Sequence, residues 1–142
     1  EIDTSLFVGS VDVYKDSVLH DGASSGGTAS SGPAAVTFVA NAHAIFAAKC
    51  SGCHTGGSAG GHNIGLADVD AAYTQSQQNA DSALCTNLSN GACALVRIQN
   101  GNMPQGRDCS GNPVMDADKP ACLTQAEQDT LAAWIAGGQV KE

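Results

Sequence analysis

Cys50-Ser51-Gly52-Cys53-His54 is the stretch on which the rest of this sequence depends, and it has the form C-x-x-C-H. Two thiols three positions apart on one turn of backbone can each form a thioether with a vinyl group of the same porphyrin. The imidazole of the next residue, His54, then lies beneath the ring, where it can ligate the iron. This spacing is the attachment signature of a c-type haem. It predicts one covalently held haem.

Two other kinds of site also use a C-x-x-C pair. A thioredoxin-type redox pair occurs in a βαβ context, whereas this pair follows an alanine-rich helical segment and precedes a glycine-rich loop. A structural zinc site needs a second pair of ligands at regular spacing. The other cysteines, which contain no second C-x-x-C, are Cys85, Cys93, Cys109 and Cys122. The motif therefore favours haem over both alternatives.

Composition limits both the core and the partners. Hydrophobic residues make up 42 % of the 142 residues, but aromatic residues only 4 %, and there are 17 glycines. The side chains alone would form a thin core, to which a haem would add a large apolar body. The formal net charge of −8 makes nucleic acid and anionic membrane surfaces unfavourable partners. No run of about 18 apolar residues exists to span a membrane.

Four cysteines remain outside the motif, and an even remainder predicts two disulfides formed in an oxidising compartment. Haem attachment of this kind also takes place outside the bacterial cytoplasm, so we expect a periplasmic or extracellular protein. Four cysteines allow three pairings. We favour Cys85–Cys93 and Cys109–Cys122, because each pair closes a short loop. The sequence shows no signal peptide, so we expect Glu1 to be a processed start.

Three segments differ in composition. Residues 1–21 form an N-terminal extension, in which residues 4–18 have the alternating β-branched pattern of a strand. Residues 22–37 contain the small, polar, glycine-rich run of a flexible linker. Residues 38–142 form the haem domain, which offers no sheet for the strand to join. The extension is therefore expected to be a disordered spacer, to fold back on its own haem domain, or to self-associate by pairing residues 4–18 with another subunit.

Helical patterns dominate the haem domain, so the expected fold class is all-α. Residues 38–50 form a first helix with Asn41 as its N-cap, and residues 68–77 and 92–99 form two short ones. A capping box, T-x-x-E, begins the last helix, and two glycines end it. The capping residues are Thr124 and Glu127, the stop is Gly137-Gly138, and the buried face is Leu131, Trp134 and Ile135.

The order of these motifs resembles that of class I cytochrome c. The resemblance covers residues 38–138: a helix that leads into C-x-x-C-H, an N-G-N-M-P segment, and a terminal helix with W-I-A-G-G. It implies a class I cytochrome c fold in which the first and last helices cross, with Phe46 and Trp134 packed together. It also implies a methionine as the distal iron ligand, and Met103 has the matching position. The lysine-rich docking face of the mitochondrial members is missing.

The candidate cofactor-binding residues follow from the motif and the resemblance. Cys50 and Cys53 are the thioether anchors, and His54 is the proximal iron ligand. A His/Met pair suits electron transfer, because a thioether is a soft, neutral donor that raises the reduction potential. We favour Met103 over Met115, which lies between cysteines before an acidic stretch.

The remaining histidines and arginines leave alternatives open. His20, His43 and His62 could each replace the methionine, but we expect each to be a solvated histidine. Arg97 and Arg107 lie on either side of the methionine loop. They either bond the haem propionates bidentately or are two ordinary surface arginines.

The function indicated by the sequence is one-electron transfer by a monohaem c-type cytochrome, with redox proteins as partners. We do not expect an enzyme, because both axial positions of the iron would be filled. Two alternatives stay open. One is a haem enzyme or gas-binding protein with an open sixth position. The other is a haem subunit of a multi-copy extracellular assembly joined through the N-terminal strand.

Overall fold

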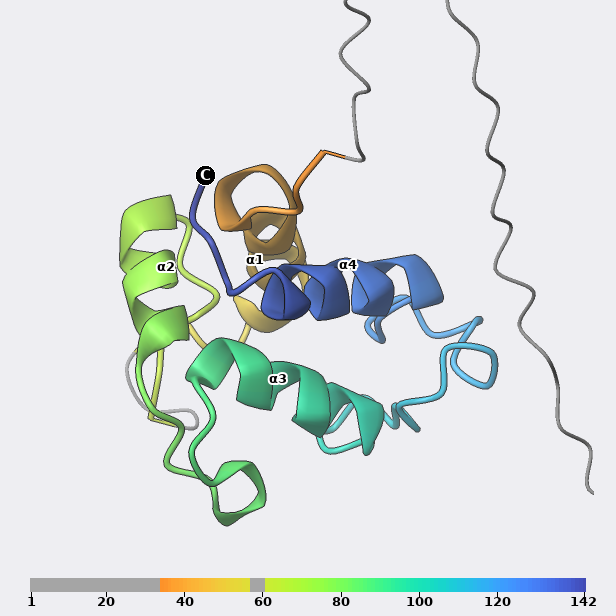
Figure 1. Ribbon diagram of the computed structural model, residues 1–142. Helices are drawn as coiled ribbons and strands as arrows, with labels where there is room; N and C mark the ends of the chain where they lie inside the picture. The colour runs from red at the N-terminus through yellow and green to blue at the C-terminus, as the bar shows by residue number, and fades with distance from the viewer. Residues whose placement is uncertain (1–33, 57–60) are drawn as a thin grey trace, which may run out of the picture. The chain divides into compact units, whose positions relative to one another are not determined.

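The structure is a computed structural model that describes residues 34–56 and 61–142 (Figure 1). The chain divides into two units, Glu1–Gly32 and Pro33–Glu142. The expected N-terminal strand at residues 4–18 and most of the expected linker lie outside the described residues. The described residues form helices joined by long loops and one isolated bridge between Asn79 and Ser89, with no sheet. None of the described helices has the length and apolar character needed to cross a membrane.

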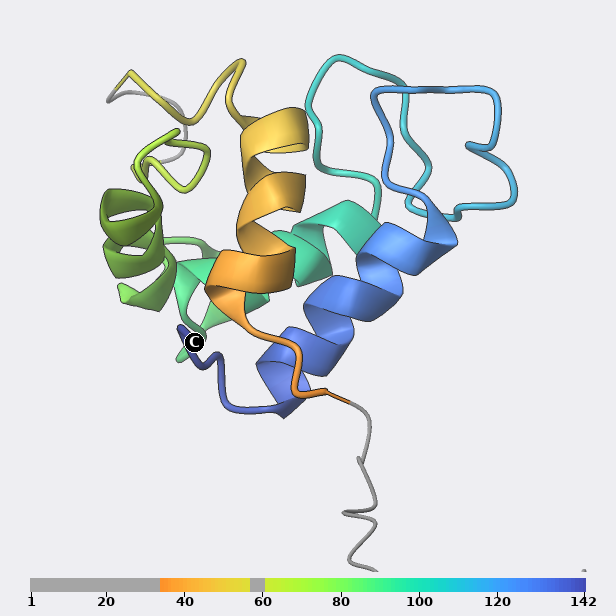
Figure 2. The same cartoon turned by 90° about the horizontal axis from the view of Figure 1, so that it is seen from above.

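Four α-helices carry the fold of the described residues, as the sequence patterns predict. They are α1 (His43–Cys50), α2 (Val69–Gln77), α3 (Asn90–Gln99) and α4 (Gln125–Ala136). Two shorter elements accompany them: a π-helical turn, η1 (Phe38–Ala42), leads into α1, and a 3₁₀ turn, η2 (Ala83–Cys85), precedes α3. Helix α3 packs against α2 and α4, and η1 packs against α4. Figure 2, which views the molecule from above, shows α1 and α4 in front of α3.

The start of the first helix differs from the sequence prediction. Asn41 is not the N-cap, because it lies inside η1; the cap is Thr37, whose hydroxyl accepts a hydrogen bond from the N–H of Ala40. The Asn41 side chain instead accepts from the N–H of Thr37, at 3.0 Å. The two side chains together satisfy donors that a helix start leaves without partners. The predicted end of the segment is correct, since α1 ends at Cys50.

The other predicted helix signals are confirmed. Thr124 and Glu127 form the capping box of α4, and Gly138, with a φ of +85°, follows its C-cap Gly137. Helix α3 begins two residues earlier than predicted, capped by Ser89, and ends before Asn100. The Asp68 side chain caps α2.

Aromatic side chains join the two ends of the domain. Phe46 and Trp134 are fully buried, with ring centroids 6.0 Å apart and an interplanar angle of 74°. Phe38 lies 5.4 Å from the same indole. The backbone N–H of Phe38 and the indole N–H of Trp134 both donate to the carbonyl of Val140, each at 2.9 Å. The C-terminal residues therefore hold the beginning of η1 against the end of α4.

The two favoured disulfides are present. Cys85 is bonded to Cys93, and Cys109 is bonded to Cys122, with Cα–Cα distances of 5.4 and 5.6 Å. The first disulfide attaches the turn η2 to helix α3, and the second closes a loop within the segment between α3 and α4. Cys50 and Cys53 are free. The cysteines thus divide into two structural bridges and one reduced pair in the motif.

Candidate functional site

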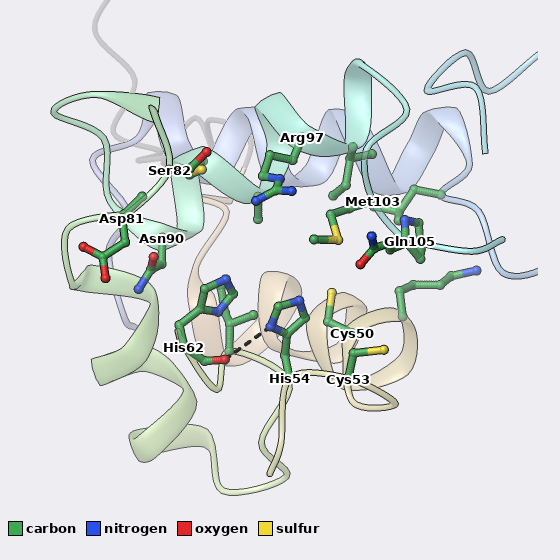
Figure 3. A pocket seen from close by; sticks show the side chains of 18 residues that line it. Cys50, Cys53, His54, His62, Asp81, Ser82, Asn90, Arg97, Met103 and Gln105 are labelled. Atoms are coloured by element: carbon green, nitrogen blue, oxygen red, sulfur yellow. Dashed lines mark hydrogen bonds between the residues drawn. The ribbon is translucent and has the colours of Figure 1, made fainter. Parts of the chain in front are cut away.

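One cavity collects most of the candidate residues (Figure 3). The space enclosed by its walls, together with its open mouth, is about 960 Å³. The walls come from the end of α1, the loop after the motif, residues 80–82, the inner face of α3, residues 103–105 and Leu123. Elements far apart in the sequence therefore meet around one space.

The motif itself forms a tight turn at one wall. Both the N–H of Cys53 and the N–H of His54 donate to the carbonyl of Cys50, at 3.2 and 2.8 Å. All three side chains line the cavity. Burial, together with the neighbouring Cys53, raises the pKa of the Cys50 thiol to about 12.

A glycine allows the next loop to approach this turn closely. A Cβ at Gly65 would lie 2.7 Å from the backbone nitrogen of Ser51 and 2.8 Å from the carbonyl carbon of Cys50. Any side chain at this position would push the loop and the motif apart. The N–H of Gly65 also donates to the carbonyl of His54, at 3.1 Å.

His54 is prepared for metal ligation by its own hydrogen bond. Its Nδ1 lies 3.2 Å from the carbonyl oxygen of His62, drawn as the dashed line in Figure 3. A carbonyl can only accept, so Nδ1 carries the proton and donates it. This leaves the lone pair of Nε2 free, as in histidines whose other ring nitrogen bonds a backbone carbonyl while they hold a metal.

The prediction that His62 is a solvated histidine is wrong. Its ring is stacked on that of His54, with centroids 4.3 Å apart and an interplanar angle of 3°, and it lines the cavity. Burial, then the charges of His54 and Arg97, lower the pKa of His62 to about 4. His43 is not free in solvent either, because its Nε2 bonds the carbonyl of Leu66 at 2.9 Å. His20 lies outside the described residues.

Met103 reaches the cavity from the side opposite His54 (Figure 3). The loop after α3 positions it: the N–H groups of Asn102 and Met103 both donate to the carbonyl of Arg97, at 2.8 and 3.0 Å. Met115 is 68 % exposed and does not line the cavity. Of the two methionines, the structure brings only Met103 together with the motif.

Of the two candidate arginines, too, only one lines the cavity. Arg97 lines the cavity, whereas Arg107 is exposed and is not among the lining residues. Arg97 Nε and His62 Nδ1 are buried without a hydrogen-bond partner among the described residues. Such groups are costly to bury unless something bonds them.

The donor set fits a haem c. Two free thiols, an imidazole nitrogen and a thioether sulfur share one largely apolar cavity, with the unpartnered Nε of Arg97 on its wall. Thiols bond the vinyl groups, nitrogen and sulfur ligate iron, and the unpartnered Nε of Arg97 matches a carboxylate of a porphyrin. Each of these donors therefore has a counterpart on this cofactor.

Lys49 is a residue of this site that the sequence patterns did not reveal. Its ammonium donates to the carbonyls of Pro120 and Cys122, at 2.7 and 3.1 Å, and lies 3.6 Å from a carboxylate oxygen of Glu127. It thus ties the residue before Cys50 to the second disulfide loop. Helical position alone places Lys49 beside the motif, but its partners are more than 70 positions away.

Comparison with known proteins points to one family. The family model of cytochrome c matches residues 39–139. No curated protein and no solved structure matches the chain.

Proposed function

The chain belongs to the cytochrome c family and is a haem-binding electron carrier with covalently bound haem c, and we propose that His54 and Met103 are the two axial ligands of a single haem iron. Cys50 and Cys53 hold the porphyrin through thioethers, and their turn keeps His54 next to it. When bound, the haem supplies one-electron chemistry between the ferric and ferrous states of its iron.

One observation carries the ligand assignment: Met103 lies across the cavity from His54, while Met115 is at the surface. The hydrogen bond from His54 Nδ1 to the carbonyl of His62 fixes which nitrogen faces the cavity. The thioether of Met103 is a soft, neutral donor that stabilises the reduced state and so raises the reduction potential. This combination suits an electron carrier.

Arg97 is the residue we assign to the haem propionates. Its buried Nε has no partner among the described residues and it lines the cavity, so a carboxylate would satisfy it. Arg107 is exposed outside the cavity, which favours its alternative role as a surface arginine.

The proposed ligand set also argues against an enzyme. If the imidazole of His54 and the thioether of Met103 both ligated the iron, no position would be left for a substrate or a gas. The open-site alternative would require Met103 to leave the cavity, although two backbone hydrogen bonds to Arg97 hold its loop.

The proposed setting is periplasmic or extracellular, supported by the two disulfides, which persist in oxidising compartments. The proposed partners are redox proteins, and the net charge of −8 favours a basic surface around their redox centres.

Self-association through residues 4–18, and with it the alternative of a multi-copy assembly, rests on sequence pattern alone. Deleting residues 1–32 and comparing molar masses by light scattering tests it, since an unchanged oligomeric state rules it out.

The proposed function is tested on the intact chain as isolated. A mass spectrum recorded before and after reduction of disulfides should show one covalent haem and two disulfides. The oxidised protein should show the methionine-to-iron charge-transfer band at the red end of the visible spectrum. A mass without haem, or a spectrum without that band, contradicts the proposal.

A further inference from the structure

His62 holds His54 in two ways at once. Its carbonyl accepts the hydrogen bond from His54 Nδ1, at 3.2 Å, and its imidazole covers one face of the His54 ring at a centroid distance of 4.3 Å. The hydrogen bond needs only the backbone, so any residue at this position could make it. The stacked ring is specific to the side chain present here.

From this contact we propose that the His62 ring is a positioning element that fixes the plane of the His54 imidazole about the iron–nitrogen axis. The inference rests on the proposed function, since it concerns the orientation of an iron ligand. A ring can tilt about a single hydrogen bond, whereas a flat group packed on its face at an angle of 3° resists that rotation. Neighbours that orient a ligating histidine also affect the affinity for the metal and its reduction potential.

The plane of an axial imidazole has a spectroscopic consequence. The π orbital of the imidazole overlaps more with one of two iron d orbitals than with the other. The rotation of the ring determines which of the two overlaps more. In a low-spin ferric haem this sets the splitting of those orbitals, and therefore the g values of the electron paramagnetic resonance spectrum. A fixed plane gives one narrow set of g values, whereas a free plane gives shifted or broadened ones.

The unpartnered Nδ1 of His62 suggests a competing explanation. It is buried, and both His62 and Arg97 line the cavity, so it could bond a carboxylate of the haem. In that case the nitrogen would matter and the flat ring would not. The two explanations differ in which substitution of His62 should keep the wild-type g values.

The experiment uses the full-length holoprotein with His62 replaced by Phe, Leu or Ala. His62→Phe keeps a flat ring without nitrogens, His62→Leu fills space without a flat face, and His62→Ala removes the contact. His43→Ala is the matched control, because that histidine bonds the carbonyl of Leu66 and lies outside the cavity lining. Ferric spectra are recorded at low temperature, together with reduction potentials.

We expect His62→Phe and His43→Ala to keep the wild-type g values, and His62→Leu and His62→Ala to shift or broaden them. Loss of haem in the Leu and Ala variants but not in the Phe variant also supports the proposal. Wild-type g values in His62→Ala overturn it, as does a Phe variant that behaves like the Ala variant or loses haem with it. A wild-type protein without the methionine charge-transfer band marks failure of the ligand assignment instead.

Discussion

Gly91 lies directly against the indole of Trp134: a Cβ at this position would be 2.8 Å from both Cη2 and Cζ3 of the ring. The same Cβ would be 2.9 Å from the side-chain oxygen of Gln139. Trp134, a residue of α4, is fully buried, and its indole also packs against the ring of Phe38 in η1. The close approach of α3 to α4 therefore depends on a residue without a side chain.

Gly91→Ala should destabilise the domain by about 1–3 kcal/mol, the usual range for overpacking a core. The gain in helix propensity from Gly to Ala, about 1 kcal/mol, acts in the opposite direction but should not compensate for the clash. Chemical denaturation gives the unfolding free energy. Gly56→Ala is the control, because a Cβ there meets nothing within 4 Å. A Gly91 variant as stable as wild type would show that the indole can shift.

If Met103 is the sixth iron ligand, as proposed, Met103→Ala should lower the reduction potential and abolish the methionine charge-transfer band. Visible spectra and potentiometry on the holoprotein measure both effects. Met115→Ala should change neither, because its side chain lies at the surface outside the cavity. An unchanged spectrum in Met103→Ala would exclude this residue as the ligand.

Lys49→Met should cost about 1.5–3 kcal/mol of stability, the range for hydrogen bonds made by a charged group. The substitution keeps the aliphatic part of a side chain that is only 16 % exposed, but removes the donor shared by Pro120 and Cys122. Denaturation curves measure the loss. Lys141→Met is the control: its partner Asp70 is 74 % exposed, so solvent screens that pair and it should contribute little. Equal losses in the two variants would contradict the structural role of Lys49.

Asp116 should make the stability depend on pH at the acidic end. Burial acts to raise the pKa of its carboxyl, but hydrogen bonds from Lys119 and Ser110 outweigh burial and hold the pKa below its usual 3.8. A lowered pKa means that the carboxylate stabilises the fold above pH 3.8 and that this contribution is lost as the pH falls further. Unfolding free energies should therefore differ between wild type and Asp116→Asn at neutral pH, and converge below about pH 4. A difference that stays constant down to acidic pH would refute this assignment.

The net charge of −8 predicts how electron exchange should respond to salt. With a redox protein that is basic around its redox centre, the rate should fall as salt screens the attraction. Stopped-flow measurements over a series of ionic strengths test this. A neutral small-molecule reductant serves as control and should show little dependence. A rate that rises with salt toward the basic partner would contradict electrostatic steering.

Local signals in the sequence predicted much of the fold. The capping box at Thr124, the glycines after α4 and the apolar spacing in α2 each act within a few residues, so a linear reading detects them. Asn41 shows the limit of such signals. Asn and Thr are both good N-caps, and the sequence alone did not reveal that a π-helical turn capped by Thr37 would begin before Asn41.

The site was predictable where the chemistry is contained in a short motif, and not where it depends on distant contacts. The predictions of Cys50, Cys53 and His54 follow from their spacing, and that of Met103 follows from the resemblance to class I cytochrome c. The role of His62 depends on the packing of its ring against His54, and that of Lys49 depends on a hydrogen bond to the carbonyl of Pro120. Neither contact leaves a periodic or spaced pattern in the sequence.

The hydrogen bonds from Phe38 and Val39 to the carbonyls of Val140 and Lys141 join the first and last turns of the haem domain. None of these four residues lines the cavity. A polypeptide attached before Phe38 and one attached after Lys141 would leave the domain from neighbouring points. A domain whose two ends lie close together can be inserted as a unit into a longer polypeptide. Its ends can also be linked to each other, with new termini created at another position. The molecule is thereby suited to circular permutation and to tandem fusion without strain on the haem cavity.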